Sequence, residues 1–214
     1  MKVAILGLGR FGTQLVEELV SMGTEVLAID VDEARVSEVA ETALLAAQGD
    51  LADYEFLESL ALKDYDTVVV AVGSEVATSV LVALTLKQRL KLPHVVAKAS
   101  TNDHAVALEL AGADIIVRPE QEAAIRLAHT LGSRHVGDYL SIGPEYGVAR
   151  IAAPVSATGH RMDELAIVKK SKVFLVARIR GDSVSFNPDL NETVLSGDDW
   201  VIAGRDEDLR ALET

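Results

Sequence analysis

The first thirty residues constrain the fold of this chain more than any other stretch. A short apolar run, Lys2 to Leu6, leads directly into the segment GLGRFG at positions 7–12, which has the spacing G-x-G-x-x-G. Apolar residues at helical spacing follow, and a second apolar run ends at Asp30. The motif therefore has a strand before it, a helix after it and an acidic residue about twenty positions further on. This pattern predicts a βαβ unit that binds a nucleotide.

Each glycine of the segment has a physical role in that prediction. The first allows the tight turn, the second lets the backbone approach a pyrophosphate, and the third lets the helix pack close to the strand. The start of the helix then presents unpaired N–H groups and its positive dipole end to the phosphates. Asp30 is placed to accept hydrogen bonds from ribose hydroxyls, and its charge disfavours NADP because it would repel the 2′-phosphate.

Strands and helices alternate through the rest of the N-terminal part. We expect strands at 2–6, 25–29, 43–47, 67–72, 94–97 and 114–117, and further helices at 33–40, 54–60, 74–90, 102–110 and from Pro119 onward. The alternation predicts an α/β fold, a Rossmann-like doubly wound parallel sheet with the strand order 3-2-1-4-5-6. With 49% hydrophobic and only 4% aromatic residues, the core must consist mostly of aliphatic side chains. Such a composition suits a parallel sheet that is buried on both faces.

The sequence changes character after Gly132. We expect the Rossmann domain to span 1–133, a polar link to span 134–147, and a small α+β subdomain to span 148–214. Within that subdomain, short strands are expected at 148–153, 173–179, 183–186 and 200–203, and short helices at 161–168 and 206–212. Gly181 and Asp182 suit a two-residue turn between two of the strands.

Composition argues against several classes of protein. The net charge of −13 disfavours a nucleic-acid partner, because phosphate contacts need clustered Lys and Arg. The chain has no cysteine, so disulfides and thiolate chemistry are excluded. No run approaches the roughly 18 apolar residues that span a bilayer, and the first residues form a predicted strand rather than a signal peptide. The five histidines show no metal-ligand spacing.

The whole chain resembles a known family, the RCK (also called KTN) regulatory subunits of bacterial potassium transporters of the Trk and Ktr type. The residues that carry the resemblance are Arg10 and Phe11 within the glycine segment, Ala113 and Asp114, Arg118 to Glu120, Asn187 and Pro188, Thr193 to Leu195, Gly197 and Asp198, Gly204, and Asp208 and Leu209. The single RCK unit resembles Ktr-type subunits, whereas Gly49-Asp50 resembles the corresponding pair of Trk-type proteins.

The resemblance implies a gating subunit and not an enzyme. Such a subunit senses ATP and ADP, or NAD and NADH, and controls a membrane potassium channel subunit of the KtrB or TrkH type. The family's subunits form dimers of Rossmann domains and octameric rings in the cytoplasm, peripheral to the inner face of the cell membrane. In some relatives the C-terminal subdomain binds cyclic di-AMP. By the same resemblance, Glu120 reaches the neighbouring subunit's site, where its carboxylate holds a divalent or monovalent cation at the phosphates.

The predicted nucleotide contacts all lie at the carboxyl ends of predicted strands. They are Gly7, Leu8, Gly9, Arg10, Phe11, Gly12, Asp30, Val31, Asp50, Leu51, Ala71, Val72, Gly73, Lys98 and Glu120. Arg10 is expected to bind a phosphate, because an unpaired cation in the first turn would oppose the helix dipole. Asp50 either accepts a hydrogen bond from the adenine amino group or caps a helix. Lys98 either faces the phosphates or lies on the surface, and Arg35 either stacks near the base or is solvated.

Two alternatives to a gating subunit remain open. One is an NAD-dependent dehydrogenase with a small accessory domain, and the other is a scaffold with a structural nucleotide. None of the four tyrosines has a lysine four residues later. The chain therefore lacks the Tyr-x-x-x-Lys motif, which supplies the catalytic acid of short-chain dehydrogenases. The C-terminal module is also too small for a typical substrate domain. We therefore expect no catalytic residues.

Overall fold

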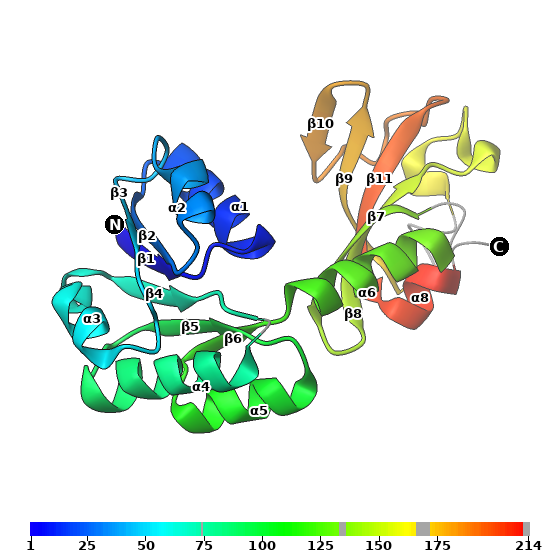
Figure 1. The fold of residues 1–214 in the computed structure, drawn as a ribbon. Helices are drawn as coiled ribbons and strands as arrows, with labels where there is room; N and C mark the ends of the chain where they lie inside the picture. Colours follow the sequence, from blue (N-terminus) through cyan, green and yellow to red (C-terminus); the bar gives the residue numbers. More distant parts are fainter. Residues whose placement is uncertain (74, 133–135, 166–171, 212–214) are drawn as a thin grey trace. The chain divides into compact units, whose positions relative to one another are not determined.

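The computed structural model describes residues 1–73, 75–132, 136–165 and 172–211. Contacts divide the chain into two compact units, Met1–Glu120 and Gln121–Thr214, and each is considered by itself. The first unit is a helix-covered parallel sheet, and the second is built on an antiparallel sheet (Figure 1).

The first unit has six strands in the order β3-β2-β1-β4-β5-β6, which confirms the predicted topology. The strands are β1 (Lys2–Leu6), β2 (Glu25–Asp30), β3 (Leu45–Gln48), β4 (Thr67–Val70), β5 (Val95–Lys98) and β6 (Ile115–Val117). All neighbouring pairs are parallel. The strand order reverses between β1 and β4, which opens a crevice at their carboxyl ends.

The helices cover both faces of this sheet. They are α1 (Arg10–Ser21), α2 (Glu33–Val39), α3 (Tyr54–Ser59), α4 (Val76–Leu84) and α5 (Asn102–Ala111). Alternate residues of β1 point to opposite faces. Val3 and Ile5 pack in one core with residues of α1 and α2, whereas Ala4 and Leu6 pack in the other with residues of α3, α4 and α5. Both cores are almost entirely aliphatic, as the composition requires.

Short polar side chains fix the starts of several of these helices. Asp32 caps α2 by accepting from the Ala34 N–H, and Asp53 caps α3 by accepting from the N–H groups of Glu55 and Phe56. Helix α4 continues beyond its last residue as a π-helix, Thr85–Arg89. The helix expected at 74–90 therefore begins at Val76 and changes its pitch near its end, and position 74 lies outside the described residues.

The second unit contains a five-stranded antiparallel sheet in the order β10-β9-β11-β8-β7. Its elements are α6 (Pro119–Gly132), whose first two residues belong to the first unit, β7 (Val136–Gly143), β8 (Tyr146–Ala152), β9 (Phe174–Arg180), β10 (Ser183–Phe186), β11 (Asp198–Arg205), α8 (Asp206–Arg210) and the 3-10 turns Val155–Ala157 and Met162–Glu164. Its core packs around Trp200, Met162 and Ile202, which are all buried.

The region expected to be a polar link is structured where it is described. Val136–Gly143 forms strand β7, which pairs with β8. The prediction failed because β7 is an edge strand of which only Tyr139 is buried, so it shows no apolar alternation. Gly147 on β8 leaves room for that tyrosine, since a Cβ there would lie 2.3 Å from its ring.

One further expectation differs from the structure in the second unit. The helix expected at 161–168 is only a 3-10 turn, Met162–Glu164, and its end falls on 166–171, outside the described residues. In the described part of the chain, no helix combines the length and the apolar character needed to cross a membrane.

Candidate nucleotide-binding site

A cavity of about 730 Å³ lies at the carboxyl ends of β1, β2, β4 and β5 in the first unit. It is lined by Gly7, Gly9, Arg10, Phe11, Gln14, Asp30, Arg35, Ala71, Val72, Gly73, Lys98 and Glu120. Its volume is within the range of about 300–1,000 Å³ that is usual for small-molecule sites. The cavity thus occupies the switch point at which a doubly wound sheet binds its ligand.

The three glycines of the loop differ in what surrounds them. Gly7 has φ +104, and a Cβ on Gly12 would lie 2.0 Å from the Gly7 carbonyl oxygen. Both positions are therefore restricted to glycine by the chain itself. A Cβ on Gly9 would meet nothing within 4 Å. The middle glycine leaves open space, as expected where a ligand approaches the backbone.

Helix α1 begins at this loop without a side-chain cap. Gly9 is its N-cap residue, and its first turn contains no acidic residue. The first N–H groups of a helix have no partner within the helix, and they bind anions together with the dipole. Arg10, the first helical residue, is exposed and lines the cavity.

Asp30 lies at the end of β2 and is only 4% exposed. Its carboxylate accepts hydrogen bonds from the N–H of Leu8 at 2.6 Å and from the N–H of Asp32 at 2.9 Å. The Arg35 guanidinium lies 3.6 Å from the same carboxylate. An ionised carboxyl has about four lone-pair directions, so these contacts leave acceptor capacity for a ribose. Asp30 therefore holds the glycine loop as well as lining the cavity.

Lys98 and Glu120 form an ion pair within the cavity, with 2.6 Å between Nζ and Oε1. The side chain of Lys98 is 13% exposed, whereas that of Glu120 is 68% exposed. The hydrogen bond from Lys98 holds the pKa of the Glu120 carboxyl below its ordinary value, and the charge of Arg10 acts in the same direction. The Lys98 ammonium also lies 5.6 Å from the centre of the Phe11 ring.

The charges around the cavity differ from those of the whole chain. Its lining has three cationic side chains, Arg10, Arg35 and Lys98, and only two carboxylates. The chain as a whole carries a net charge of −13. An anionic ligand would therefore meet a locally favourable site on an otherwise acidic protein. Within the described residues, no group of three His, Cys, Asp or Glu side chains has a metal-binding arrangement.

Five of the predicted contacts lie outside the cavity lining. Leu8 is buried and contributes its backbone N–H to Asp30, and Gly12 packs against Gly7. Val31 is exposed, and Leu51 is buried in the core. The Asp50 carboxylate accepts from the N–H of Ala52 at 2.8 Å, as a local turn would require. Its contact with adenine stays a prediction.

Two residues that line the cavity were not predicted as contacts. Gln14 lies one turn after Arg10 on α1, and this i, i+4 spacing places both on one helix face. That spacing was the signal that the sequence offered. The sequence allows Arg35 either to stack near the base or to be solvated, and the structure places it beside Asp30 at the cavity.

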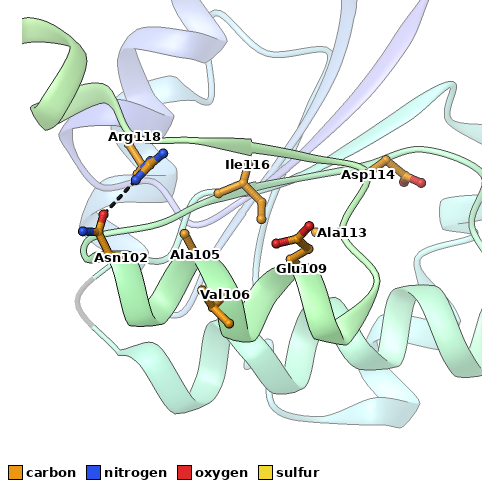
Figure 2. Close-up of a pocket in the computed structure, with 8 residues that line it drawn as sticks. All are labelled: Asn102, Ala105, Val106, Glu109, Ala113, Asp114, Ile116 and Arg118. Atoms are coloured by element: carbon orange, nitrogen blue, oxygen red, sulfur yellow. Dashed lines mark hydrogen bonds between the residues drawn. The ribbon is translucent and has the colours of Figure 1, made fainter. Parts of the chain in front are cut away.

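A second cavity, of about 430 Å³, lies between α5 and β6 (Figure 2). Arg118, which lines it, donates to the Asn102 side-chain oxygen at 2.8 Å. Asp114, which also lines it, accepts from Lys87 Nζ and from the N–H of Val95. Of the residues that carry the family resemblance, Asp114 and Arg118 therefore have structural contacts here.

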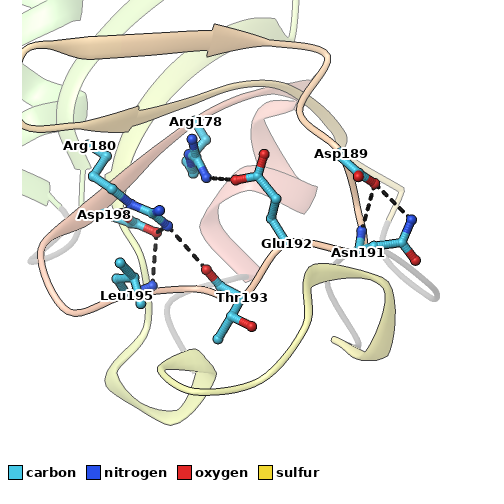
Figure 3. A network of polar contacts seen from close by, with 8 residues as sticks. All are labelled: Arg178, Arg180, Asp189, Asn191, Glu192, Thr193, Leu195 and Asp198. Carbon is cyan, nitrogen blue, oxygen red and sulfur yellow. Dashed lines mark hydrogen bonds and ion pairs between the residues drawn. The ribbon is translucent and has the colours of Figure 1, made fainter.

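The second unit contains a polar network around Asp198 (Figure 3). The Asp198 carboxylate accepts from Arg180 Nε at 2.7 Å and Nη2 at 2.8 Å, and from the N–H of Leu195 at 2.9 Å. Arg180 also donates to the Thr193 carbonyl, and Arg178 pairs with Glu192. The bond from Arg180 holds the pKa of the fully buried Asp198 carboxyl below its ordinary value. This network ties the segment before β11 to β9.

Comparison with known proteins shows similarity to potassium uptake proteins. Residues 3–119 match the family model of the TrkA-N domain. The chain is 36% identical to Ktr system potassium uptake protein C of Bacillus subtilis (strain 168), with 98% of this chain and 95% of the relative covered. It is 30% identical to Ktr system potassium uptake protein A of the same organism, with 98% and 94% covered.

Among solved structures, the fold is similar to that of the GsuK channel bound to NAD. The TM-score is 0.68 and the identity 18%, and the match covers 99% of this chain and 38% of the channel chain. At this identity the likeness concerns the fold.

Proposed function

Because the chain belongs to the family of Ktr-type potassium uptake proteins that contain a TrkA-N domain, we propose that it is the nucleotide-binding regulatory subunit of a potassium uptake system. In this role it binds an adenine nucleotide in the cavity of its first unit and controls a membrane potassium channel subunit of the KtrB or TrkH type. It acts in the cytoplasm, peripheral to the inner face of the cell membrane through that partner.

The observation that carries the proposal is the composition of the cavity lining. The glycine loop and the uncapped start of α1 suit the inner phosphates, and Asp30 suits the ribose. Arg10 and Lys98 add cationic groups beyond the loop. A guanidinium makes bidentate, charge-assisted contacts to phosphate. This set of groups favours ATP or ADP, with NAD or NADH as the alternative ligands.

Further parts of the proposal rest on the family resemblance. Glu120 is the carboxylate that would hold a cation at the phosphates, and the C-terminal subdomain would take cyclic di-AMP. The subunits would form dimers of Rossmann domains and an octameric ring. A nucleotide can change the ring only if it binds two shapes with different affinity.

Binding and regulation can be tested separately. We expect an adenine nucleotide to co-purify with the protein in native mass spectrometry, and calorimetry to detect binding of ATP and ADP. In cells that lack potassium uptake, the channel subunit is then expressed with and without this chain, and we expect uptake to depend on it. Absence of binding to ATP, ADP and NADH would contradict the proposal.

The proposed oligomeric state can be measured separately. Light scattering is expected to give at least a dimer, and an octamer in the complete ring. A monomeric mass, both with and without nucleotide, would contradict the assembly proposed here.

The alternative function is an NAD-dependent dehydrogenase. Both relatives that establish the family are named as potassium uptake proteins and neither as an enzyme. We therefore expect no turnover of NADH with a pool of small metabolites. Sustained NADH oxidation by the purified protein would favour the dehydrogenase.

A further inference from the structure

The ion pair between Lys98 and Glu120 joins a nearly buried cation to an exposed carboxylate. The Lys98 side chain is 13% exposed, and that of Glu120 is 68% exposed. Both side chains line the nucleotide cavity. The two partners therefore differ in their freedom to move. The exposed Glu120 carboxylate is the partner that can leave the ion pair and be solvated.

Two neighbours lie close to the end of the Lys98 side chain. Its ammonium lies 5.6 Å from the centre of the Phe11 ring. On another side, a Cβ added to Gly73 would lie only 3.3 Å from its Cε and Nζ atoms. The ammonium therefore lies in the cavity wall near Phe11 and Gly73, where an anionic group that enters the cavity can reach it.

We propose that, in the absence of a bound cation, Glu120 competes with the nucleotide's phosphates for Lys98, and that a polyphosphate displaces this carboxylate when it binds, which frees it for the cation site proposed above. The inference rests on the proposed function, because it concerns the same site. A carboxylate 2.6 Å from the ammonium uses one of its three donors. A phosphate on the remaining donors would then lie next to a like charge. Binding therefore favours ligands whose phosphates carry enough negative charge to displace a single carboxylate from Lys98.

The position of Glu120 in the chain gives the displacement a consequence. Glu120 is the last residue of the first unit, and it lies in the first turn of α6, whose remaining residues belong to the second unit. A change in the partner of Glu120 therefore acts at the residue where the chain passes from one unit to the next. Through this carboxylate, the phosphates would influence the start of α6.

The test uses the full-length protein in buffer that contains EDTA, so that no divalent cation contributes. Glu120→Gln removes the charge and keeps the size of the side chain. We expect it to raise ATP affinity about ten-fold, the scale of one charge-assisted hydrogen bond, and to leave adenosine affinity unchanged. Lys98→Met should lower ATP affinity, and Glu120→Gln should have a smaller effect when Lys98 is already replaced.

Glu122→Gln is the matched control, because Glu122 is an exposed acid on the same helix that does not line the cavity. It changes the net charge by the same amount, and we expect ATP affinity to change less than two-fold. Unchanged or weaker ATP binding by Glu120→Gln would overturn the proposal, and so would an equal gain in Glu122→Gln. If the unaltered protein binds no nucleotide, the proposed function fails instead. If it binds ATP and Glu120→Gln shows no gain, only the competition fails.

Hydrogen exchange provides a second readout. We expect ATP to change exchange in the first turns of α6 of the unaltered protein. In Glu120→Gln, the first turns of α6 should already exchange, without any ligand, as they do in the ATP-bound unaltered protein. Identical exchange in the two proteins, with and without ATP, would overturn the role of Glu120 at the start of α6. Thermal unfolding of each variant verifies that it is folded.

Discussion

The backbone N–H of Leu8 donates a 2.6 Å hydrogen bond to the carboxylate of Asp30, at the end of the next strand. The two parts of the nucleotide signature, the glycine loop and the acid, are thus bonded to each other. Asp30 also accepts from the N–H of Asp32 through its other oxygen. Asp30, which is expected to contact the ribose, therefore also has a structural role in the loop that is expected to bind the phosphates.

The first prediction concerns this double role of Asp30. Asp30→Ala leaves the buried N–H of Leu8 and the partly buried N–H of Asp32 without an acceptor. An orphaned buried donor costs about 1–3 kcal/mol. We expect lower stability in urea unfolding together with loss of nucleotide binding in calorimetry. Asp53→Ala is the matched control, because Asp53 also accepts two backbone N–H groups but lies outside the cavity lining. It should cost about 0.5–2 kcal/mol and leave binding unchanged. Equal binding by Asp30→Ala and the unaltered protein would contradict a ribose contact.

The second prediction compares two glycines of the loop. In Gly12→Ala the new Cβ meets the Gly7 carbonyl at 2.0 Å, so the loop must shift and the protein is destabilised. Gly9 has φ −69 and open space around it, so Gly9→Ala should unfold within about 0.5 kcal/mol of the unaltered protein. Its methyl group nevertheless occupies the path of the phosphates, and we expect weaker nucleotide binding. Gly9→Asp should abolish binding. Full ATP affinity in Gly9→Ala would show that no ligand approaches this backbone.

The third prediction is that Arg10 distinguishes ligands by their phosphates. Charge-assisted hydrogen bonds are worth about 1.5–3 kcal/mol each, so losing one lowers affinity roughly ten-fold or more. Arg10→Ala should weaken ATP most, ADP less and NADH least in calorimetry. Arg89→Ala is a suitable control, because Arg89 lies over the Tyr54 ring and does not line the cavity. Equal losses for the three ligands would indicate that Arg10 only positions the loop.

The fourth prediction concerns the pH dependence of stability through His104. This side chain is 1% exposed. Its Nδ1 accepts from the N–H of Ser100 at 3.2 Å, so Nε2 carries the proton and faces Ser79 Oγ at 2.5 Å. Protonation of Nδ1 would place its new N–H group opposite the N–H of Ser100, so that two donors would face each other. Burial lowers the pKa of His104, so the unfolded chain takes up the proton first as the pH falls.

The contribution of His104 is therefore complete above the unfolded pKa of about 6.5 and is lost progressively below it. Between about pH 7.5 and pH 5.5, the free energy of unfolding should fall more steeply for the unaltered protein than for His104→Asn. The difference in slope is at most about 1.4 kcal/mol per pH unit. Asparagine keeps an acceptor near Ser100 but does not titrate. Parallel pH profiles of the two proteins would contradict the assignment.

The fifth prediction separates the two units. Asp198→Ala removes a buried carboxylate from its pair with Arg180 and should cost about 3 kcal/mol. The only tryptophan, Trp200, is buried in the second unit, so its fluorescence reports this unfolding. Asp199→Ala breaks the neighbouring, more exposed pair with Arg150 and should cost less than about 1 kcal/mol. Nucleotide affinity should be unchanged in both. Similar unfolding temperatures for the two variants would contradict the role of the Asp198 network.

The elements that were predicted well are the strands whose side chains are buried on both faces of the sheet. β1, β2 and β4 are buried on both faces, so their continuous apolar runs identify them without any knowledge of their neighbours. The glycine loop was predictable because its requirements are local to the backbone. Together these features sufficed for the strand order and for the position of the cavity.

The features that were missed depend on contacts distant in sequence. β7 buries only Tyr139, so its exposed residues and glycines resemble a link. The π-helix at 85–89 adds no local signal to an otherwise continuous helical pattern. Val31 and Leu51 belong to the predicted strand ends, but the direction of each side chain is set by the surrounding fold. Arg35 lines the cavity because Asp30 attracts it.

The hydrogen bond that Asp30 accepts from the loop also limits how the nucleotide preference of this protein can evolve. In doubly wound folds, the acid at this position selects against a 2′-phosphate, and an arginine nearby can accommodate that group. Here Arg35 already lies beside the acid, so a single replacement of Asp30 would otherwise open a path toward NADP-like ligands. That replacement removes the acceptor of the Leu8 N–H and disorganises the phosphate loop at the same time. The predicted preference against 2′-phosphorylated nucleotides would therefore be protected by the folding requirement of the loop.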